Sequence, residues 1–122
     1  MIRTFRDLLV WQKAMAFALG VYRESRGFPR EETFGLVSQL RRSAVSVPCN
    51  IAEGFSRSSR VDFVRFLRVA LGSLFEAQTQ LELALQIGYL APGSYGPLFD
   101  QSREIERMMT ALIAKLAKKA KA

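Results

Sequence analysis

Apolar residues recur at helical spacing along four separate stretches of the chain. The first stretch is bounded by a capping-box sequence at Thr4–Asp7 and by Gly27-Phe28-Pro29, which are signals for the start and the end of a helix. Apolar residues within it lie three or four positions apart, so they share one helix face. The pattern predicts a first helix over about residues 4–26. Its apolar stripe consists of Leu8, Trp11, Met15, Leu19 and Tyr22.

The second stretch predicts a helix from Pro29 to about Gly54. Glu31 and Glu32 would occupy its first turn, where carboxylates favour the positive end of the helix dipole. Pro48 removes one backbone hydrogen bond, so we expect a kink there. A break is not expected, because the apolar face continues past the proline. That face consists of Leu36, Leu40, Ala44, Val47 and Ile51.

A second capping box at Ser59–Asp62 opens a third helix, which we expect to end near Gly88. Tyr89–Pro97 is rich in proline and glycine and predicts a loop, with a fourth helix starting at about Pro97. The third helix has apolar residues both on and beside its seam, an arc wider than one core needs. The seam is Phe63, Leu67, Ala70, Leu74, Ala77, Leu81 and Ala84, the residues beside it are Phe66, Leu71, Phe75 and Leu85, and the stripe of the fourth helix is Leu98, Ile105, Met109, Leu112 and Leu116.

Four helices joined by short connections predict an all-α fold, an antiparallel up-down-up-down four-helix bundle with a Pro-kinked second helix. The 122 residues suit a single domain over 1–122, with a basic tail from about residue 115 that frays. Exposed apolar area beyond a few hundred Å² marks an interface. The wide apolar arc of the third helix therefore predicts a homo-oligomer.

The formal net charge is +7, and the excess lies at the two chain ends. Residues 1–30 hold six basic and two acidic side chains, and residues 107–122 hold five basic and no acidic ones. A positive balance favours a polyanionic partner through non-specific attraction. The N-terminus has no signal-peptide pattern, and no apolar run is long enough to cross a membrane. With one cysteine, Cys49, these features lead us to expect a cytoplasmic protein with no membrane partner.

The second predicted helix also carries a line of polar residues on one face. This line could bind a ligand, or it could form a structural network between helices or subunits. We favour the network, because buried polar groups usually have partners. Arg42 and Glu53 lie ~16 Å apart along one helix, so Arg42 is expected to pair with Glu76 or with Glu53 of a neighbouring copy. The assembly network consists of Gln39, Arg42, Ser46, Asn50, Glu53 and Glu76.

Two groups of basic residues are candidates for nucleic-acid binding, one near the start of the third helix and one in the tail. Both could follow a phosphate backbone. Both could instead be solvated surface, with Asp62 and Arg65 forming an ordinary helix-face pair. A homo-oligomer would repeat the first group in every copy, which favours nucleic acid. The candidates are Arg57, Arg60, Arg65, Arg68, Lys115, Lys118 and Lys119.

Catalytic patterns are scarce. The chain has no histidine, which excludes a Ser-His-Asp triad and a His-based metal site. Cys49 has no adjacent imidazolium to activate it, and we interpret it as a small core residue. Glu53 and Glu76 could hold Mg²⁺ for a nuclease, but isolated glutamates more often form salt bridges. We expect no catalytic residue, no cofactor and no metal.

Several blocks of sequence follow one another in a familiar order. They are FRDLLVWQKA at 5–14, FP at 28–29, ETFGL at 32–36, SQLRRSAVSVP at 38–48, NIAEG at 50–54, and 63–83 with GSL at 72–74 and Glu76. Together these blocks resemble the four helix bundle protein family, which includes the intervening-sequence proteins encoded within insertions in bacterial 23S ribosomal RNA genes. The resemblance covers roughly residues 5–113. Cys49 stands where serine is more usual, and the tail after Ala114 is outside the pattern.

The resemblance implies an antiparallel bundle that assembles into a ring, a pentamer in members of known structure. It also implies kinship with the accessory protein of diversity-generating retroelements, which binds nucleic acid and partners a reverse transcriptase. Our first hypothesis is a non-catalytic ring that binds RNA or DNA through repeated basic patches, as an adaptor. A protein-interaction scaffold without nucleic-acid binding is the alternative, and a metal-dependent nuclease is a remote third.

Overall fold

The computed structural model describes the backbone of residues 1–121 and the side chains of residues 1–118. Every regular element within this range is helical, and there is no strand. Four long helices form the body, and two short 3₁₀ segments precede the first two of them. The elements are η1 (Phe5–Asp7), α1 (Leu9–Ser25), η2 (Arg30–Glu32), α2 (Leu36–Phe55), α3 (Arg60–Ile87) and α4 (Pro92–Lys121).

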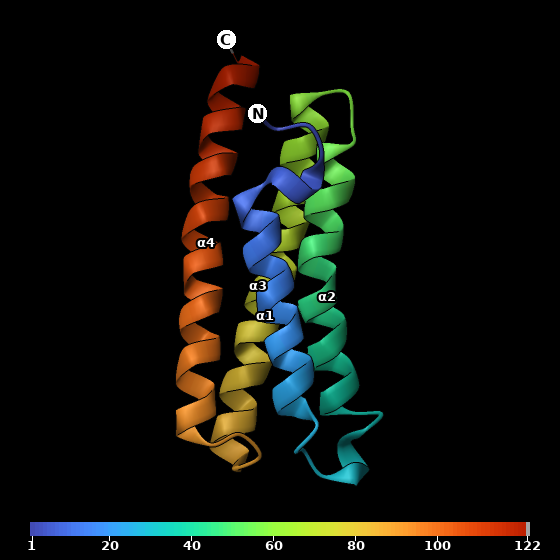
Figure 1. The fold of residues 1–122 in the computed structure, drawn as a ribbon, viewed down its shortest axis with the longest axis vertical. Coiled ribbons are helices and arrows are strands. Elements are labelled where there is room, and N and C mark those ends of the chain that lie inside the picture. Colours follow the sequence, from blue (N-terminus) through green and yellow to red (C-terminus); the bar gives the residue numbers. More distant parts are fainter. Residues whose placement is uncertain (122) are drawn as a thin grey trace.

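The four helices lie side by side along the long axis of the molecule (Figure 1). α1 packs against α2 and α4, and α3 packs against the same two helices. The turn between α2 and α3 lies at the end of the molecule that also carries both chain termini. This arrangement brings the arginines around that turn and the lysines of late α4 to one end.

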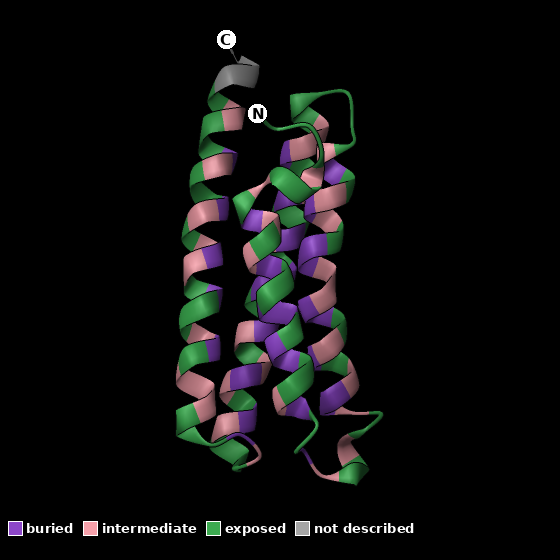
Figure 2. Cartoon of the chain, viewed as in Figure 1, coloured by how far each residue is buried: buried purple, intermediate pink, exposed green. Residues whose placement is uncertain are grey.

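The buried residues lie mainly on the helix faces that turn toward the space between the four helices (Figure 2). The expected seam of α3 is confirmed from Leu67 onward, since each of its members down to Ala84 is at most 1% exposed. Phe63 packs against the core and is partly buried. α2 contributes Leu40, Val47 and Ile51, and α4 contributes Ile105 and Met109.

The predicted apolar stripe of α1 is only partly inward. Leu8 and Trp11 pack against the core, whereas Leu19 is 60% exposed. The fully buried face is formed instead by Val10, Ala14, Phe17 and Val21. α1 is apolar around most of its circumference, so more than one stripe fits helical spacing, and from Met15 onward the predicted stripe faces outward beside α2.

The capping box at Thr4 exists, but it caps the start of η1 and not the start of α1. The Thr4 hydroxyl accepts a hydrogen bond from the Arg6 amide, and the Asp7 carboxylate accepts from the Thr4 and Arg3 amides. The bonds from the Thr4 and Arg3 amides lower the pKa of Asp7. Leu8 is extended, with φ −76° and ψ 122°. The helical conformation is therefore interrupted at Leu8, and α1 starts at Leu9.

Glu31 and Glu32 do not lie in the first turn of α2, as we had expected, but in the separate segment η2. Glu32 nevertheless caps α2, because its carboxylate accepts a hydrogen bond from the Leu36 amide at 3.0 Å. The Tyr89 hydroxyl donates to the other oxygen of the same carboxylate, also at 3.0 Å. This hydrogen bond is the main cause of the raised pKa of Tyr89.

α2 is continuous across Pro48, so no break occurs there, and the kink stays a prediction. α3 begins as expected, with the Ser59 hydroxyl accepting from the Asp62 amide, and ends at Gly88 with a left-handed φ of 98°. The predicted loop over 89–97 was too long, because α4 already begins at Pro92. Proline suits the first helical position, where its missing N–H is not needed.

Candidate nucleic-acid interface

Four arginines surround the short turn from α2 to α3. Arg57 lies in the turn, and Arg60, Arg65 and Arg68 follow on α3. The guanidinium carbons of Arg57 and Arg65 lie 4.9 Å and 4.8 Å from the centre of the Phe66 ring. Both distances are within the range of cation–π attraction. The structure thus gathers two of the candidate arginines on one aromatic ring.

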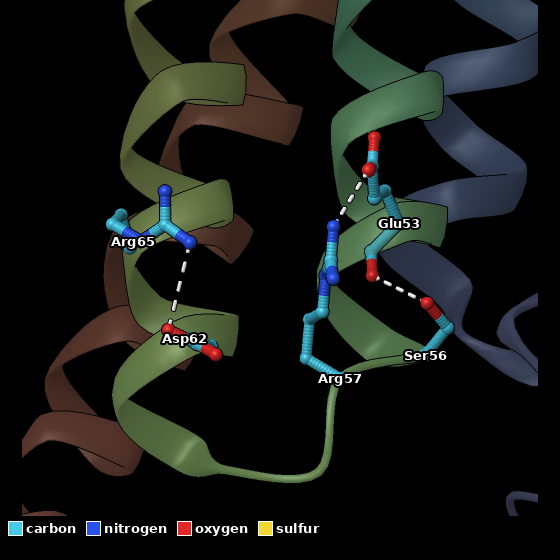
Figure 3. Close-up of polar contacts among 5 residues, drawn as sticks. All are labelled: Glu53, Ser56, Arg57, Asp62 and Arg65. Atoms are coloured by element: carbon cyan, nitrogen blue, oxygen red, sulfur yellow. Dashed lines mark hydrogen bonds and ion pairs between the residues drawn. The ribbon is translucent and has the colours of Figure 1, made fainter.

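Two of the four arginines are also paired with carboxylates (Figure 3). Arg57 Nη2 lies 2.9 Å from Glu53 Oε1, and Arg65 Nη2 lies 3.5 Å from Asp62 Oδ1. These pairs are about half exposed and contribute little to stability, but they offset two positive charges. Within the described residues, neither Arg60 nor Arg68 has a carboxylate within 4.0 Å. Arg60 and Arg68 are therefore the arginines most available to a phosphate.

Gly54 allows α3 to approach α2 closely beneath this cluster. A Cβ at residue 54 would lie 2.7 Å from Phe66 Cβ and 3.0 Å from Phe63 Cδ1. The Phe63 ring also packs edge-on against Phe55, with centroids 5.9 Å apart. The aromatic support of the arginines thus depends on a glycine at residue 54.

The candidate lysines lie near the end of α4. Lys115 and Lys118 are exposed, and the side chain of Lys119 lies outside the described residues. The end of α4 and the α2–α3 turn lie at the same end of the molecule in Figure 1. The two groups of basic candidates are therefore at one end of the bundle, on different helices.

Part of the polar line on α2 forms a network within the chain. The hydroxyls of Ser46 and Ser73 lie 2.8 Å apart and connect α2 to α3. The Asn50 amide donates to the Ser46 hydroxyl and carbonyl. About one turn earlier on α2, the Ser43 hydroxyl donates to the Gln80 side-chain oxygen at 2.6 Å. Ser46 and Asn50 therefore belong to an intramolecular network, and Ser43, Ser73 and Gln80 are members that the sequence reasoning missed.

Only one of the two pairings expected for Arg42 can be checked within one chain. Arg42 is exposed and has no ion pair with Glu76 among the described residues, and its pairing with Glu53 of a neighbouring copy stays a prediction. Glu53 pairs with Arg57 of its own chain. Gln39, Arg42 and Glu76 instead line a cleft of about 430 Å³ between α2 and α3. The rest of its lining is Phe34, Ser38, Ser43, Ser46, Ser73 and Gln80.

An apolar groove of about 460 Å³ lies between α1 and α2. Cys49 lies in it and is exposed, so our interpretation of this residue as core was wrong. The groove contains most of the α1 stripe that we had assigned to the core. The apolar spacing of these α1 residues was visible in the sequence. Spacing alone did not show which face of α1 packs into the core. The groove is lined by Phe5, Trp11, Met15, Ala18, Leu19, Tyr22, Val45, Pro48, Cys49 and Ala52.

The described residues contain neither a metal-binding cluster nor a membrane-spanning helix. No group of three or more cysteine, aspartate or glutamate side chains is placed to hold a metal ion within this part of the chain. Among the described helices, none is both long and apolar enough to cross a membrane.

Comparison with known proteins adds family membership to this geometry. The family model for the 23S rRNA-intervening sequence protein matches residues 6–111. The chain belongs to this family. It is also similar to a crystal structure from Bacteroides thetaiotaomicron, described as a protein with unknown function from the S23 ribosomal protein family. That match has a TM-score of 0.81 and 28% identity, and covers 87% of this chain and 96% of the other. No curated protein matches the chain.

Proposed function

We propose that this protein is a non-catalytic adaptor that binds the backbone of RNA or DNA. The observation that carries the proposal is the position of Arg60 and Arg68, which are unpaired among the described residues beside an arginine-aromatic cluster. Arginine binds phosphate through a planar, bidentate fork. Contacts of this kind supply affinity without reading sequence. Lys115 and Lys118 of α4 extend the positive surface at the same end of the bundle.

We further propose that antiparallel up-down-up-down bundles of this chain assemble into a ring, the pentamer that the resemblance implies. The apolar groove between α1 and α2 supplies one contact surface. An outer apolar patch on α3 supplies the other, and its members are exposed by 44–50%. Because the two surfaces differ, the contact is head-to-tail, and such contacts form a ring when the rotation between copies closes. The patch consists of Phe75, Leu83 and Ile87.

Ring assembly strengthens the nucleic-acid proposal. Each copy adds another Arg60 and Arg68, so the positive potential repeats around the axis. A concentrated field of one sign raises the association rate and the local concentration of a polyanion.

Light scattering coupled to size exclusion tests both parts of the proposal. The protein alone should elute at a multiple of the protomer mass, and it should co-elute with labelled RNA or DNA at low salt. A monomer at micromolar concentration contradicts the ring, and separate elution at low salt contradicts the nucleic-acid role.

A protein-interaction scaffold is the second candidate. It is favoured by the pairing of Arg57 and Arg65 with Glu53 and Asp62, which reduces the positive charge of the cluster. On this account the excess charge serves solubility, and a protein such as a reverse transcriptase is the partner. An oligomer that binds no RNA or DNA at low salt would favour the scaffold.

A further inference from the structure

The cleft between α2 and α3 has a hydrogen-bonded floor and an unpaired rim. Its floor is held by the contact between Ser46 and Ser73 and by the bond from Ser43 to Gln80. On the rim, the side chains of Gln39, Arg42 and Glu76 have no hydrogen bond or ion pair among the described residues, whereas the floor residues are satisfied. The rim therefore offers donors and an acceptor that the chain does not use.

Phe34 completes the lining of this cleft. Its side chain is 96% exposed, the most exposed aromatic ring that the structure describes. It precedes α2 directly, since Gly35 is the residue that caps the helix. The cleft thus combines an accessible aromatic face with charged and amide groups. Its volume of about 430 Å³ falls in the range of small-ligand sites.

We propose that this cleft binds one unpaired nucleotide of a single-stranded nucleic acid. The proposal rests on the proposed function, because it adds a base-binding site to the phosphate contacts at the α2–α3 turn. Phe34 stacks on the base, and stacking on an aromatic side chain strengthens the binding of a single strand by roughly tenfold per base. Arg42 donates to a phosphate or to a base acceptor, and Glu76 accepts a hydrogen bond from a base amino or imino group.

The composition of the cleft favours a nucleotide over other occupants. A simple anion would be repelled by Glu76, and an apolar helix would leave Gln39, Arg42 and Glu76 without partners. A base has a flat apolar face together with donors and acceptors on its edge, which matches the aromatic ring and the polar rim. In a duplex these edges are paired, so the cleft should distinguish single strands from duplexes.

Substitution of Phe34 tests the site without risk to the fold, because the side chain is almost fully exposed. Fluorescence anisotropy measures the binding of labelled single-stranded RNA, single-stranded DNA and duplex DNA. Phe34→Leu should weaken binding of single strands by about tenfold and leave duplex binding unchanged. Phe34→Trp, the matched control, should retain single-strand binding, and in a Trp11→Phe background its fluorescence should be quenched by a single strand. Arg42→Gln should also weaken single-strand binding.

The outcomes separate this inference from the proposed function. If Phe34→Leu and Arg42→Gln bind single strands like the wild type while Arg60→Gln binds all nucleic acids more weakly, the cleft proposal is wrong and the proposed function stands. If the Phe34 or Arg42 variants lower the oligomer mass and leave single-strand affinity unchanged, the cleft is a subunit contact, which also overturns the proposal. If the wild type binds no nucleic acid at low salt, the proposed function itself fails.

Discussion

The Arg57 guanidinium lies 4.9 Å from the centre of the Phe66 ring. The same side chain donates to Glu53 at 2.9 Å, so an aromatic face and a carboxylate both hold it in place. Arg60, three residues further along, has neither contact among the described residues. The two arginines therefore differ in how readily they can bind a phosphate, although the sequence alone makes them look alike.

This difference predicts unequal effects of charge removal. Arg60→Gln should weaken binding to every nucleic acid tested and reduce the salt slope of the affinity by about 1, as expected for one lost phosphate contact. Arg57→Gln should have a smaller effect, because it also releases the Glu53 carboxylate from its pair. Anisotropy titrations of the two variants, compared at several salt concentrations, check this. Equal losses of affinity for both variants would show that the ion pair with Glu53 does not limit how readily Arg57 binds a phosphate.

The two glycines Gly54 and Gly72 should respond oppositely to alanine. A Cβ at residue 54 would lie 2.7 Å from Phe66 Cβ, whereas one at residue 72 would meet nothing within 4 Å. Overpacking costs ~1–3 kcal/mol, which exceeds the roughly 1 kcal/mol that alanine gains over glycine in a helix. Urea unfolding should therefore show Gly54→Ala destabilised and Gly72→Ala stabilised by about 1 kcal/mol. Destabilisation of Gly72→Ala by a similar amount would point to a close approach by another copy at residue 72.

Two exposed leucines of α1 test the ring. Leu19 lies in the apolar groove and is 60% exposed, and Leu9 is 56% exposed but does not line the groove. Leu19→Glu should lower the oligomer mass, because it places a charge in a buried contact. Leu9→Glu is the matched control and should leave the mass unchanged. Light scattering measures both, and an unchanged mass for Leu19→Glu would exclude the groove as a ring contact.

Stability should fall at alkaline pH through Tyr89. Its pKa is raised chiefly by the hydrogen bond to Glu32, so the neutral phenol is favoured in the folded state. A raised folded pKa contributes stability that is present below the unfolded value, near about 10, and is lost as the pH rises through the folded value. Tyr89→Phe should therefore show a smaller loss of unfolding free energy as the pH rises above about 10. An unchanged pH profile would contradict this coupling, and Tyr95, whose pKa burial and Glu82 also raise, accounts for part of the remainder.

The sequence predicted the helical class and the α3 seam. The seam residues from Leu67 to Ala84 lie three or four positions apart, so they share one face of the helix. It failed where two physical signals overlapped. α1 is apolar on more than one side, so spacing could not tell Phe17 from Leu19. Pro92 was read as loop because proline both ends helices and suits their first turn.

The candidate site was predictable by residue type but not by pairing. Arginines near Ser59 were visible in the sequence, yet the contacts of Arg57 and Arg65 with Phe66 depend on how the turn folds over Gly54. Glu32 was expected in the first turn of α2, and only the folded chain shows that it caps the helix from outside. Phe34 gave no signal, because it fell inside the helix predicted from Pro29 to Gly54, where a phenylalanine fits equally well in a core.

The salt dependence of duplex DNA binding tests the central claim most directly. If the protein contacts the phosphate backbone, the logarithm of its association constant should fall linearly with the logarithm of salt concentration, with a slope of about −0.9 per neutralised phosphate. The double variant Arg60→Gln/Arg68→Gln should give a shallower slope than the wild type. No binding at low salt, or an affinity that does not change with salt, would contradict the account.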